Sequence, residues 1–353
     1  MIVDDSAVVR GLVSRWIDAE PELEVVALHA NGRLAVENVA ASAPDIVVLD
    51  IEMPVMDGIE ALTRLLKAKP GVRVLMASTL TRRNAEISFR ALSLGAVDYV
   101  PKPGSNRGLT LSSDFREELL RKLKGLGRPA RQATAGPIAD SSPAQARQPL
   151  QAGIGLRPFS LVPPRILAIG SSTGGPQALI AMLAPLAATL KRLPVVIAQH
   201  MPPVFTAVLA ARLMQSTGLT AKEAADGETL KPATVYVAPG DRHLTIGASG
   251  FVRLTDEPPV HFCKPAVDPL FRSVAASYGP AALGVVLTGM GSDGAAGARA
   301  IADAGGSVIA QDAASSVVWG MPGAAALTGA CAALLPPAGI AEATAMLIRG
   351  VRP

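Results

Sequence analysis

The sequence predicts an α/β protein with two domains. At 353 residues the chain is long for a single domain, and 49% of its residues are apolar, which suffices for two buried cores. Short continuous apolar runs alternate with segments of helical periodicity, as in doubly wound parallel sheets. Residues 128–164 interrupt this alternation with a stretch rich in Pro, Ala, Gln, Gly and Ser, which is typical of a flexible linker.

The first segment repeats the strand–helix unit. Residues 46–50 and 72–78 read as buried parallel strands, and residues 58–68 carry apolar side chains at helical spacing before Pro70. Ser6 is expected to cap a helix over 6–17, whose apolar stripe consists of Val8, Val9, Leu12, Val13 and Trp16. In such a sheet, functional residues gather at the carboxyl ends of the strands.

The second segment follows the same logic. Residues 165–170, 193–200 and 283–290 are apolar runs that predict strands, each followed by a loop and a helical pattern. Residues 229–255 read instead as hairpins, with turns at Gly240-Asp241 and Ala248-Ser249-Gly250. We therefore expect a mixed but mostly parallel sheet.

Composition excludes several classes of protein. The net charge of +4 is dispersed without a Lys/Arg block, which argues against nucleic-acid binding. The two cysteines, Cys263 and Cys331, lack metal-site spacing and indicate a reduced, cytoplasmic setting. The N-terminus does not resemble a signal peptide, and no apolar run approaches the roughly 20 residues needed to span a bilayer, so we expect a soluble protein that is not inserted in a membrane.

Carboxylates converge on one edge of the first predicted sheet. Asp4 and Asp5 end the first strand and Asp50 ends another, and such crowding favours a hard divalent cation such as Mg²⁺. Lys102 follows a further strand and could bind a phosphoryl oxygen, while Ser78 offers a hydroxyl at the same edge.

These residues stand in motifs that resemble the receiver domain of response regulators, over roughly residues 1–105: DD at 4–5, LDIEMPVMDG at 49–58, MAST at 76–79 and PKP at 101–103. The resemblance implies a flavodoxin-like fold and phosphorylation of Asp50 by a sensor histidine kinase. It also implies Mg²⁺ held by Asp5, Asp50 and the Glu52 carbonyl with help from Asp4, and a switch formed by Ser78 and Lys102. The DD pair follows only three residues, so the first strand should be short.

The stretch AIGSSTGGP at 168–176 presents either a phosphate cradle or a nucleophile. A Walker loop requires a lysine after its glycines, and none follows Gly174-Gly175. A dinucleotide fingerprint requires glycines at positions that serines occupy here. The GxSxG spacing after an apolar strand, with Pro176 opening a helix, favours Ser172 as a nucleophile. Ser171 and Thr173 remain alternative hydroxyls.

A serine nucleophile needs a base and a group that orients it. His200 ends a predicted parallel strand at the edge where Ser172 should lie, whereas His243 and His261 fall in the hairpin region. Asp293 stands in a glycine-rich loop after the next strand, where it can orient the base. Backbone amides of that loop can also stabilise an oxyanion.

From residue 165 to about 348 the sequence resembles the effector domain of the chemotaxis protein-glutamate methylesterases (CheB family), in IGSSTGGP, AQHMPPVFT, VAPGDRH, TGMGSDGA and VVWGMPGA. The resemblance implies Ser172 as nucleophile, His200 as base, Asp293 as its orienter, and an oxyanion hole at the Thr173 and Met290 amides. Its substrates would be methylated chemoreceptors, with glutamine deamidation as a second activity, in chemotactic adaptation. We expect a receiver at 1–107, a connecting helix at 108–127, a flexible linker at 128–164 and a catalytic domain at 165–353.

Three other functions fit the sequence less well. A non-catalytic two-component signalling adaptor would not need the set of Ser172, His200 and Asp293. A DNA-binding response regulator would carry a basic helix-turn-helix after the linker, where this sequence has an apolar strand and a glycine turn. A nucleotide-binding oxidoreductase fails on glycine spacing. For the methylesterase we expect an unphosphorylated receiver to pack across the active-site edge and phosphorylation of Asp50 to loosen it.

Overall fold

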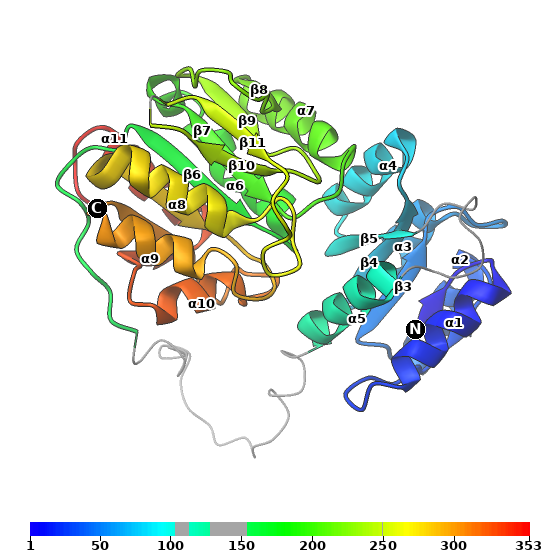
Figure 1. Cartoon of the computed structure of the whole chain (residues 1–353). Helices are drawn as coiled ribbons and strands as arrows, with labels where there is room; N and C mark the ends of the chain where they lie inside the picture. The colour runs from blue at the N-terminus through cyan, green and yellow to red at the C-terminus, as the bar shows by residue number, and fades with distance from the viewer. Residues whose placement is uncertain (103–112, 128–153, 249) are drawn as a thin grey trace, which may run out of the picture.

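The computed structural model describes residues 1–102, 113–127, 154–248 and 250–353 (Figure 1). Most of the predicted linker lies outside these residues. Its last part, from residue 154, lies against the second domain, where Arg157 N donates to Cys331 O at 3.0 Å and Ser160 N to Ser307 Oγ at 2.8 Å. Within the described residues, no helix is long and apolar enough to cross a membrane.

The first domain is a five-stranded parallel sheet between two layers of helices, with strand order β2-β1-β3-β4-β5. Its strands are β1 (Ile2–Val3), β2 (Leu28–His29), β3 (Ile46–Asp50), β4 (Arg73–Thr79) and β5 (Asp98–Lys102). Its helices are α1 (Ala7–Asp18), α2 (Gly32–Ser42), α3 (Gly58–Ala68), α4 (Arg82–Ser93) and α5 (Ser113–Gly127). Apolar residues of α2, α3 and α4 pack on one face of the sheet, and those of α1 and α5 pack on the other.

The predictions for the length of β1 and for the N-cap of α1 are confirmed, and the prediction for the apolar stripe of α1 needs one correction. β1 is two residues long, as the position of the DD pair predicts, and the Ser6 side chain caps α1 by accepting from Val9 N. The predicted apolar stripe is wrong at Val8, which is 53% exposed. The buried line of α1 runs through Val13 and Ile17, four residues apart, and Val8 projects away from it.

Helix α5 packs on the first sheet. Phe115, Leu119 and Leu123 are buried in one cluster with Val48 and Val100 from the strands. The segment expected as a connecting helix is thus also the fifth helix of the first domain, because its apolar side needs a partner and the sheet face beside α1 offers one.

The second domain has a sheet of seven strands, in the order β14-β13-β12-β6-β7-β9-β8. These are β6 (Ile166–Ser171), β7 (Val195–Gln199), β8 (Thr220–Glu223), β9 (Thr234–Val237), β12 (Ala282–Val286), β13 (Ser307–Gln311) and β14 (Ala333–Leu335). One face packs against α6 (Gly175–Leu186), α7 (Phe205–Thr217) and α11 (Pro337–Ile348); the other packs against α8 (Val267–Tyr278), α9 (Ala295–Asp303) and α10 (Met321–Leu327) (Figure 1). Two short 3₁₀ turns cover Thr189–Arg192 and Gly279–Ala281.

The expectation of a mixed sheet is wrong, because every pair in the seven-stranded sheet is parallel. β9 lies between β7 and β8, so the turn at Gly240-Asp241 closes no hairpin. β10 (His243–Ile246) and β11 (Val252–Thr255) pair in antiparallel fashion, in a separate two-stranded sheet. All four residues of β9 are buried, as in the interior of a parallel sheet.

The chain reverses direction across the sheet at β6. From β6 the sheet extends through β7, β9 and β8 on one side and through β12, β13 and β14 on the other. In open α/β sheets the crevice at such a switch point is the usual place for a binding site. The loops after β6, β7 and β12 meet there, and they carry the three predicted catalytic residues.

Candidate functional site

The turn after β6 is fixed by hydrogen bonds from two neighbouring strands. Ser172 N donates to Thr288 O at 3.0 Å, and the Gln199 side chain accepts from Ser171 Oγ at 2.6 Å while donating to Ser172 O at 2.9 Å. Gly174 has φ = +77°, which lets the chain turn sharply into α6. The turn is therefore held by its backbone and by Gln199, a buried residue that the sequence analysis missed.

The three hydroxyls of the turn have different surroundings. Ser171 Oγ is engaged with Gln199, and Thr173 Oγ1 donates to Asp98 Oδ2 at 2.6 Å. Among the described residues, Ser172 Oγ has no hydrogen-bond partner, and the side chain lies at the surface end of β6 with 8% exposure. Of the three candidates, Ser172 is the one whose hydroxyl is free to react.

His200 and Asp293 are joined directly. His200 follows β7, and its Nε2 lies 2.7 Å from Asp293 Oδ2. Both Asp293 oxygens also accept backbone amides at the start of α8, from Val267 at 2.6 Å and Asp268 at 2.9 Å. The carboxylate is thus held rigidly against the imidazole, as an orienting group must be.

Ser172 and His200 lie at the ends of adjacent strands but are not hydrogen-bonded to each other in the part of the chain that the structure describes. His200 N donates to Ser171 O at 3.1 Å, which brings the two loops together. His200 Nδ1 is buried without a hydrogen-bond partner. The nucleophile and the base are neighbours, and each keeps one polar atom unengaged.

Buried neighbours shift the pKa values of both His200 and Asp293. Burial by itself raises the pKa of Asp293, but the imidazole and the amides of Val267 and Asp268 outweigh it and lower the pKa. Burial alone would lower the pKa of His200, but the Cys263 sulfur and the Asp293 carboxylate raise it. Cys263 was not anticipated at this site; nothing in its local sequence marks it, because it is brought here by the loop before α8.

The other two histidines of this domain differ in their surroundings, and His261 shares those of Asp293: a ring nitrogen of His261 and carboxylate oxygens of Asp268 and Asp293 lie within 4.8 Å of one another. His243 is fully buried, with Nδ1 accepting from Ala266 N at 3.2 Å and Nε2 lying 3.1 Å from Pro258 O. His261 is half-exposed and lies 3.4 Å from Asp268 Oδ2. His243 is therefore a structural residue of the loop before α8.

The loop after β12 passes closely over Ser172. A Cβ at Gly289 would lie 2.9 Å from Ser172 Cβ and 2.3 Å from Met321 Sδ, so only glycine fits. Neither the Thr173 nor the Met290 backbone amide donates a hydrogen bond among the described residues. Both amides remain available for a ligand.

The predicted acidic edge of the first domain is assembled. Carboxylate oxygens of Asp4, Asp5 and Asp50, here called the acidic cluster, lie within 4.8 Å of one another. Lys102 Nζ lies 2.6 Å from Asp4 Oδ2 and 2.8 Å from Asp50 Oδ1. Burial raises the pKa of Asp50 to about 6, although Lys102 opposes the shift.

Two further predicted residues border the acidic cluster less directly. Glu52 and Asp5 line a cavity of about 700 Å³ next to it, and the Glu52 carbonyl accepts no hydrogen bond within the described ranges. Ser78 is buried, and its Oγ donates to Thr79 O at 3.4 Å and to Asn84 O at 3.5 Å; in the part of the chain that the structure describes it makes no hydrogen bond with Lys102. A hard cation has suitable oxygen donors here.

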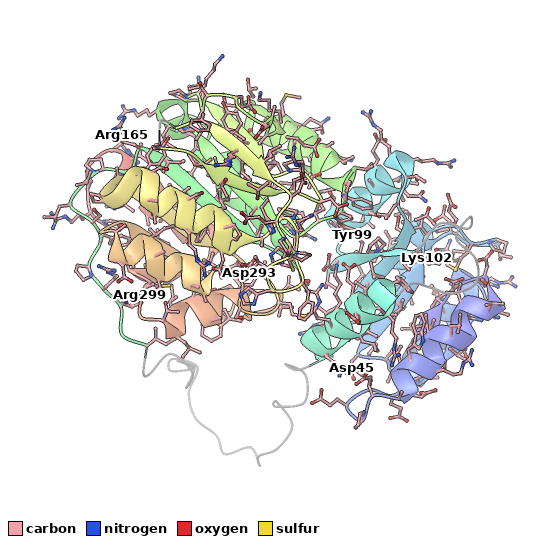
Figure 2. All side chains as sticks on the ribbon, in the orientation of Figure 1. Asp45, Tyr99, Lys102, Arg165, Asp293 and Arg299 are labelled. Carbon is pink, nitrogen blue, oxygen red and sulfur yellow. The ribbon has the colours of Figure 1, made fainter. Side chains whose placement is uncertain are left out.

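The first domain docks against the loops of the second that carry the predicted catalytic residues. Asp98 at the start of β5 accepts from Thr173 and pairs with Lys122 Nζ at 2.9 Å. The ring of Tyr99 stacks on Phe205, with centroids 4.3 Å apart. Figure 2 shows Tyr99 on the side of the first domain that faces the second, with Lys102 farther from the junction.

Helix α5 continues this contact across the loop after β12. A Cβ at Gly125 would overlap the end of the Met290 side chain, and Arg121 Nη1 lies 3.9 Å from Cys263 Sγ. On the other side of the junction, Gln177 Nε2 donates to Ala96 O at 3.1 Å. The first domain thereby contacts the neighbours of Ser172 and His200.

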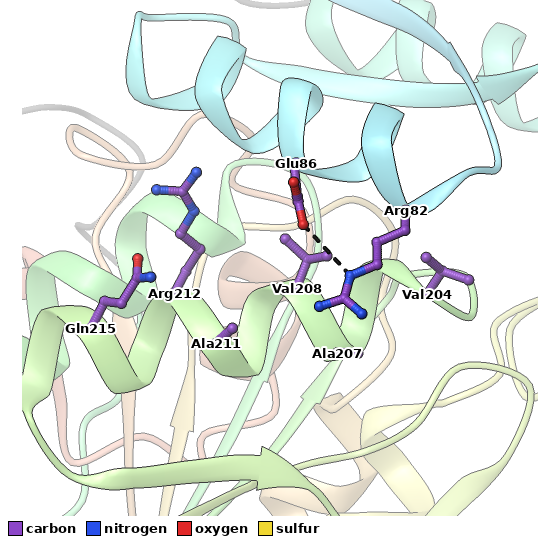
Figure 3. A pocket seen from close by; sticks show the side chains of 8 residues that line it. All are labelled: Arg82, Glu86, Val204, Ala207, Val208, Ala211, Arg212 and Gln215. Atoms are coloured by element: carbon purple, nitrogen blue, oxygen red, sulfur yellow. Dashed lines mark ion pairs between the residues drawn. The ribbon is translucent and has the colours of Figure 1, made fainter.

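A groove of about 630 Å³ lies between α4 and α7 (Figure 3), lined by Arg82, Glu86, Val204, Ala207, Val208, Ala211, Arg212 and Gln215. None of the predicted catalytic residues lines it. This groove is therefore displaced from Ser172, whose neighbour Thr173 contacts the first domain.

Comparison with known proteins agrees with this geometry. A family model described as CheB methylesterase matches residues 167–344, and one described as response regulator receiver domain matches residues 1–112. The chain is 52% identical to the protein-glutamate methylesterase/protein-glutamine glutaminase of Rhodopseudomonas palustris (strain BisB5), over 95% of this chain and 90% of that protein. The relative of the group 2 operon in Bradyrhizobium diazoefficiens is also 52% identical, with the same coverage.

A solved structure is similar as well. The CheB methylesterase catalytic domain of Thermotoga maritima matches with a TM-score of 0.51 and 42% identity, and the match covers 53% of this chain and all of that one. The chain therefore belongs to the CheB family of protein-glutamate methylesterases/protein-glutamine glutaminases that carry a receiver domain.

Proposed function

We propose that Ser172, His200 and Asp293 are the catalytic residues of a protein-glutamate methylesterase and protein-glutamine glutaminase that acts in chemotactic adaptation. The observation that carries this proposal is the 2.7 Å bond between His200 and Asp293 beside the turn that holds an unengaged Ser172 hydroxyl. The substrates are methylated chemoreceptors, whose cytoplasmic helices must reach an open edge of the sheet rather than a deep cavity.

The first step is attack on the ester. His200 Nδ1, the nitrogen without a partner, accepts the proton of Ser172 Oγ while that oxygen attacks the γ-carbonyl carbon of a glutamate methyl ester. For this bond to form, the two side chains must come closer than in the docked arrangement. Asp293 stabilises the imidazolium that results.

The tetrahedral intermediate then collapses. Its oxyanion accepts hydrogen bonds from the free backbone amides of Thr173 and Met290. Each such donor typically lowers the activation barrier by about 3 kcal/mol. His200 returns the proton to the leaving methanol, and water releases the acyl group from Ser172 as a glutamate carboxylate. A glutamine side chain reacts in the same way, with ammonia as the leaving group.

The receiver accepts the signal. Asp50 receives a phosphoryl group from a sensor histidine kinase, and Lys102 and Ser78 respond to the phosphate. The acidic cluster and the Glu52 carbonyl would hold Mg²⁺, which when bound neutralises charge on the transferred group. Asp50 is nucleophilic only as a carboxylate, and Lys102 favours that form.

Strand β5 connects the two sites. Lys102 at its end contacts Asp50, while Asp98 and Tyr99 at its start contact Thr173 and Phe205. Phosphorylation adds about 1.5 to 2 negative charges beside Lys102. We infer that this charge shifts β5, loosens the docked receiver and uncovers Ser172.

Methanol release from methylated chemoreceptor tests this function with the full chain. We expect release to rise when a small phosphodonor is added and to vanish in Ser172→Ala, while Asp50→Asn stays at the basal rate. Circular dichroism must show that the variants are folded. If Ser172→Ala releases methanol at the wild-type rate, the proposed nucleophile is wrong. If Asp50→Asn is fully active without phosphodonor, the inference that the unphosphorylated receiver covers Ser172 is wrong.

A further inference from the structure

Cys263 lies beside the proposed base. Its side chain is 7% exposed and interacts with the imidazole of His200, whose Nδ1 is buried and lacks a hydrogen bond. Asp293 holds the other ring nitrogen. A thiol and a carboxylate therefore both neighbour the imidazole of His200, and an imidazole neighbour can activate a cysteine toward electrophiles.

The receiver contacts this thiol. Arg121 on α5 lies 3.9 Å from Cys263 Sγ and is the receiver's contribution to its surroundings. Burial by itself raises the pKa of Cys263, but the charges of His200 and Arg121 outweigh burial and lower it. The docked receiver thus both favours the thiolate and blocks the approach of a reagent.

The second cysteine provides a contrast within the same chain. Cys331 is completely buried, and burial raises its pKa to about 12. Among the described residues, no charged group offsets this effect of burial. Cys331 is an inert core residue, and Cys263 is not.

From this geometry we infer that Cys263 is a modification site for low-molecular-weight disulfides, and that its modification inactivates the esterase when the receiver has undocked. This inference rests on the proposed function, because it concerns control of the same base. The site would make adaptation sensitive to disulfide stress only in the activated protein.

The chemistry is thiol–disulfide exchange. His200 accepts the proton of Cys263, and the thiolate attacks one sulfur of the disulfide. The new sulfur–sulfur bond forms as the old one breaks, and the other half leaves as a thiolate that takes up a proton. Cys263 is oxidised, the leaving half is reduced, and a thiol reductant reverses the reaction. The added group then occupies the space beside His200 that Ser172 and the substrate need.

The test measures modification and activity separately in the full chain. The protein is treated with 2,2′-dithiodipyridine, with and without beryllofluoride and Mg²⁺ as a phosphate mimic, and each cysteine is followed by peptide mass spectrometry. In the activated protein we expect Cys263 to react at least about tenfold faster than Cys331, and faster than in the protein without the mimic. In Asp50→Asn the mimic should not accelerate the reaction.

Activity follows modification if the inference is right. Methanol release should fall in step with labelling of Cys263 and return after dithiothreitol. Cys263→Ser should retain its own starting activity under the treatment that inactivates wild type. Cys331→Ser should lose activity as wild type does. If Cys263→Ser does not fold, Cys263→Ala takes its place.

Equal reactivity of the two cysteines, or full labelling of Cys263 without loss of activity, would overturn the inference. Sensitivity retained in Cys263→Ser would overturn it as well. A failure of the proposed function has a different signature, since methanol release would then be absent before any reagent is added, while the labelling rates would still show whether Cys263 is the activated thiol.

Discussion

The two functional edges of this protein differ in how completely they are assembled. Both lie at the carboxyl ends of parallel strands. At the acidic cluster, Lys102 already bonds Asp4 and Asp50. At the esterase edge, His200 bonds Asp293, but Ser172 Oγ and His200 Nδ1 stand apart without partners among the described residues. The acidic edge is therefore the more completely bonded of the two, and the second edge lacks a bond between the proposed nucleophile and the proposed base.

The largest effect should come from Asp293. In Asp293→Asn the imidazole loses its orienting charge and can adopt the wrong tautomer, and we expect kcat for methanol release to fall about 10⁴-fold. Asp303→Asn removes an exposed carboxylate at the end of α9 and should leave kcat unchanged. An Asp293→Asn enzyme with near wild-type kcat would show that the esterase edge does not depend on this pair.

The next effect concerns the covering contact. Asp98→Asn removes the charge that accepts from Thr173 and pairs with Lys122, and hydrogen bonds to charged groups contribute about 1.5–3 kcal/mol. We expect methanol release without phosphodonor to rise roughly tenfold or more, provided that unfolding measurements show an intact receiver. Glu117→Gln, which changes an exposed carboxylate of α5, is the control. No rise would mean that Asp98 does not hold the domains together.

The acidic edge should respond to pH. Because burial raises the pKa of Asp50 to about 6, the reactive carboxylate is present above that pH and is lost as pH falls through it. The rate of phosphorylation by acetyl phosphate should therefore decline about tenfold per pH unit below 6. A rate that stays flat down to pH 4.5 would contradict the raised pKa.

The smallest effect should come from Gln177. Its bond to Ala96 O joins the domains through neutral groups, which typically contribute about 0.5–1.5 kcal/mol. Gln177→Ala should raise basal activity only a few-fold, with Gln215→Ala on the exposed side of α7 as the matched control. An effect as large as that of Asp98→Asn would show that the junction depends on the bond of Gln177 rather than on the buried charge of Asp98.

Sequence was sufficient for the residues that stand at strand ends. Ser172, His200, Asp293 and the acidic cluster follow apolar runs, and parallel pairing of those runs forces their ends together. The same reasoning misjudged β9, because the turn signal at Gly240-Asp241 fits a hairpin as well as a loop that leaves the sheet. The roles of residues such as Ser172 remain predictions that the kinetic experiments must decide.

The contacts between the domains could not be predicted. Asp98, Arg121 and Cys263 carry no periodicity or motif that pairs them with partners in the other domain, since their neighbours depend on how two complete folds dock. The closeness of Cys263 to His200 arises likewise from the path of the loop before α8, which no local pattern records.

Besides the Tyr99 amide, the Asp98 carboxylate has side-chain partners in both domains, Lys122 in the first and Thr173 in the second. If the domains part, it gives up Thr173 to water and keeps Lys122, so neither fold is left with a solitary ion in its interior. Thr173 likewise finds water in place of the carboxylate. Separation of the domains then requires no unfolding of either one. A receiver built in this way can undock and dock again many times within the life of one molecule.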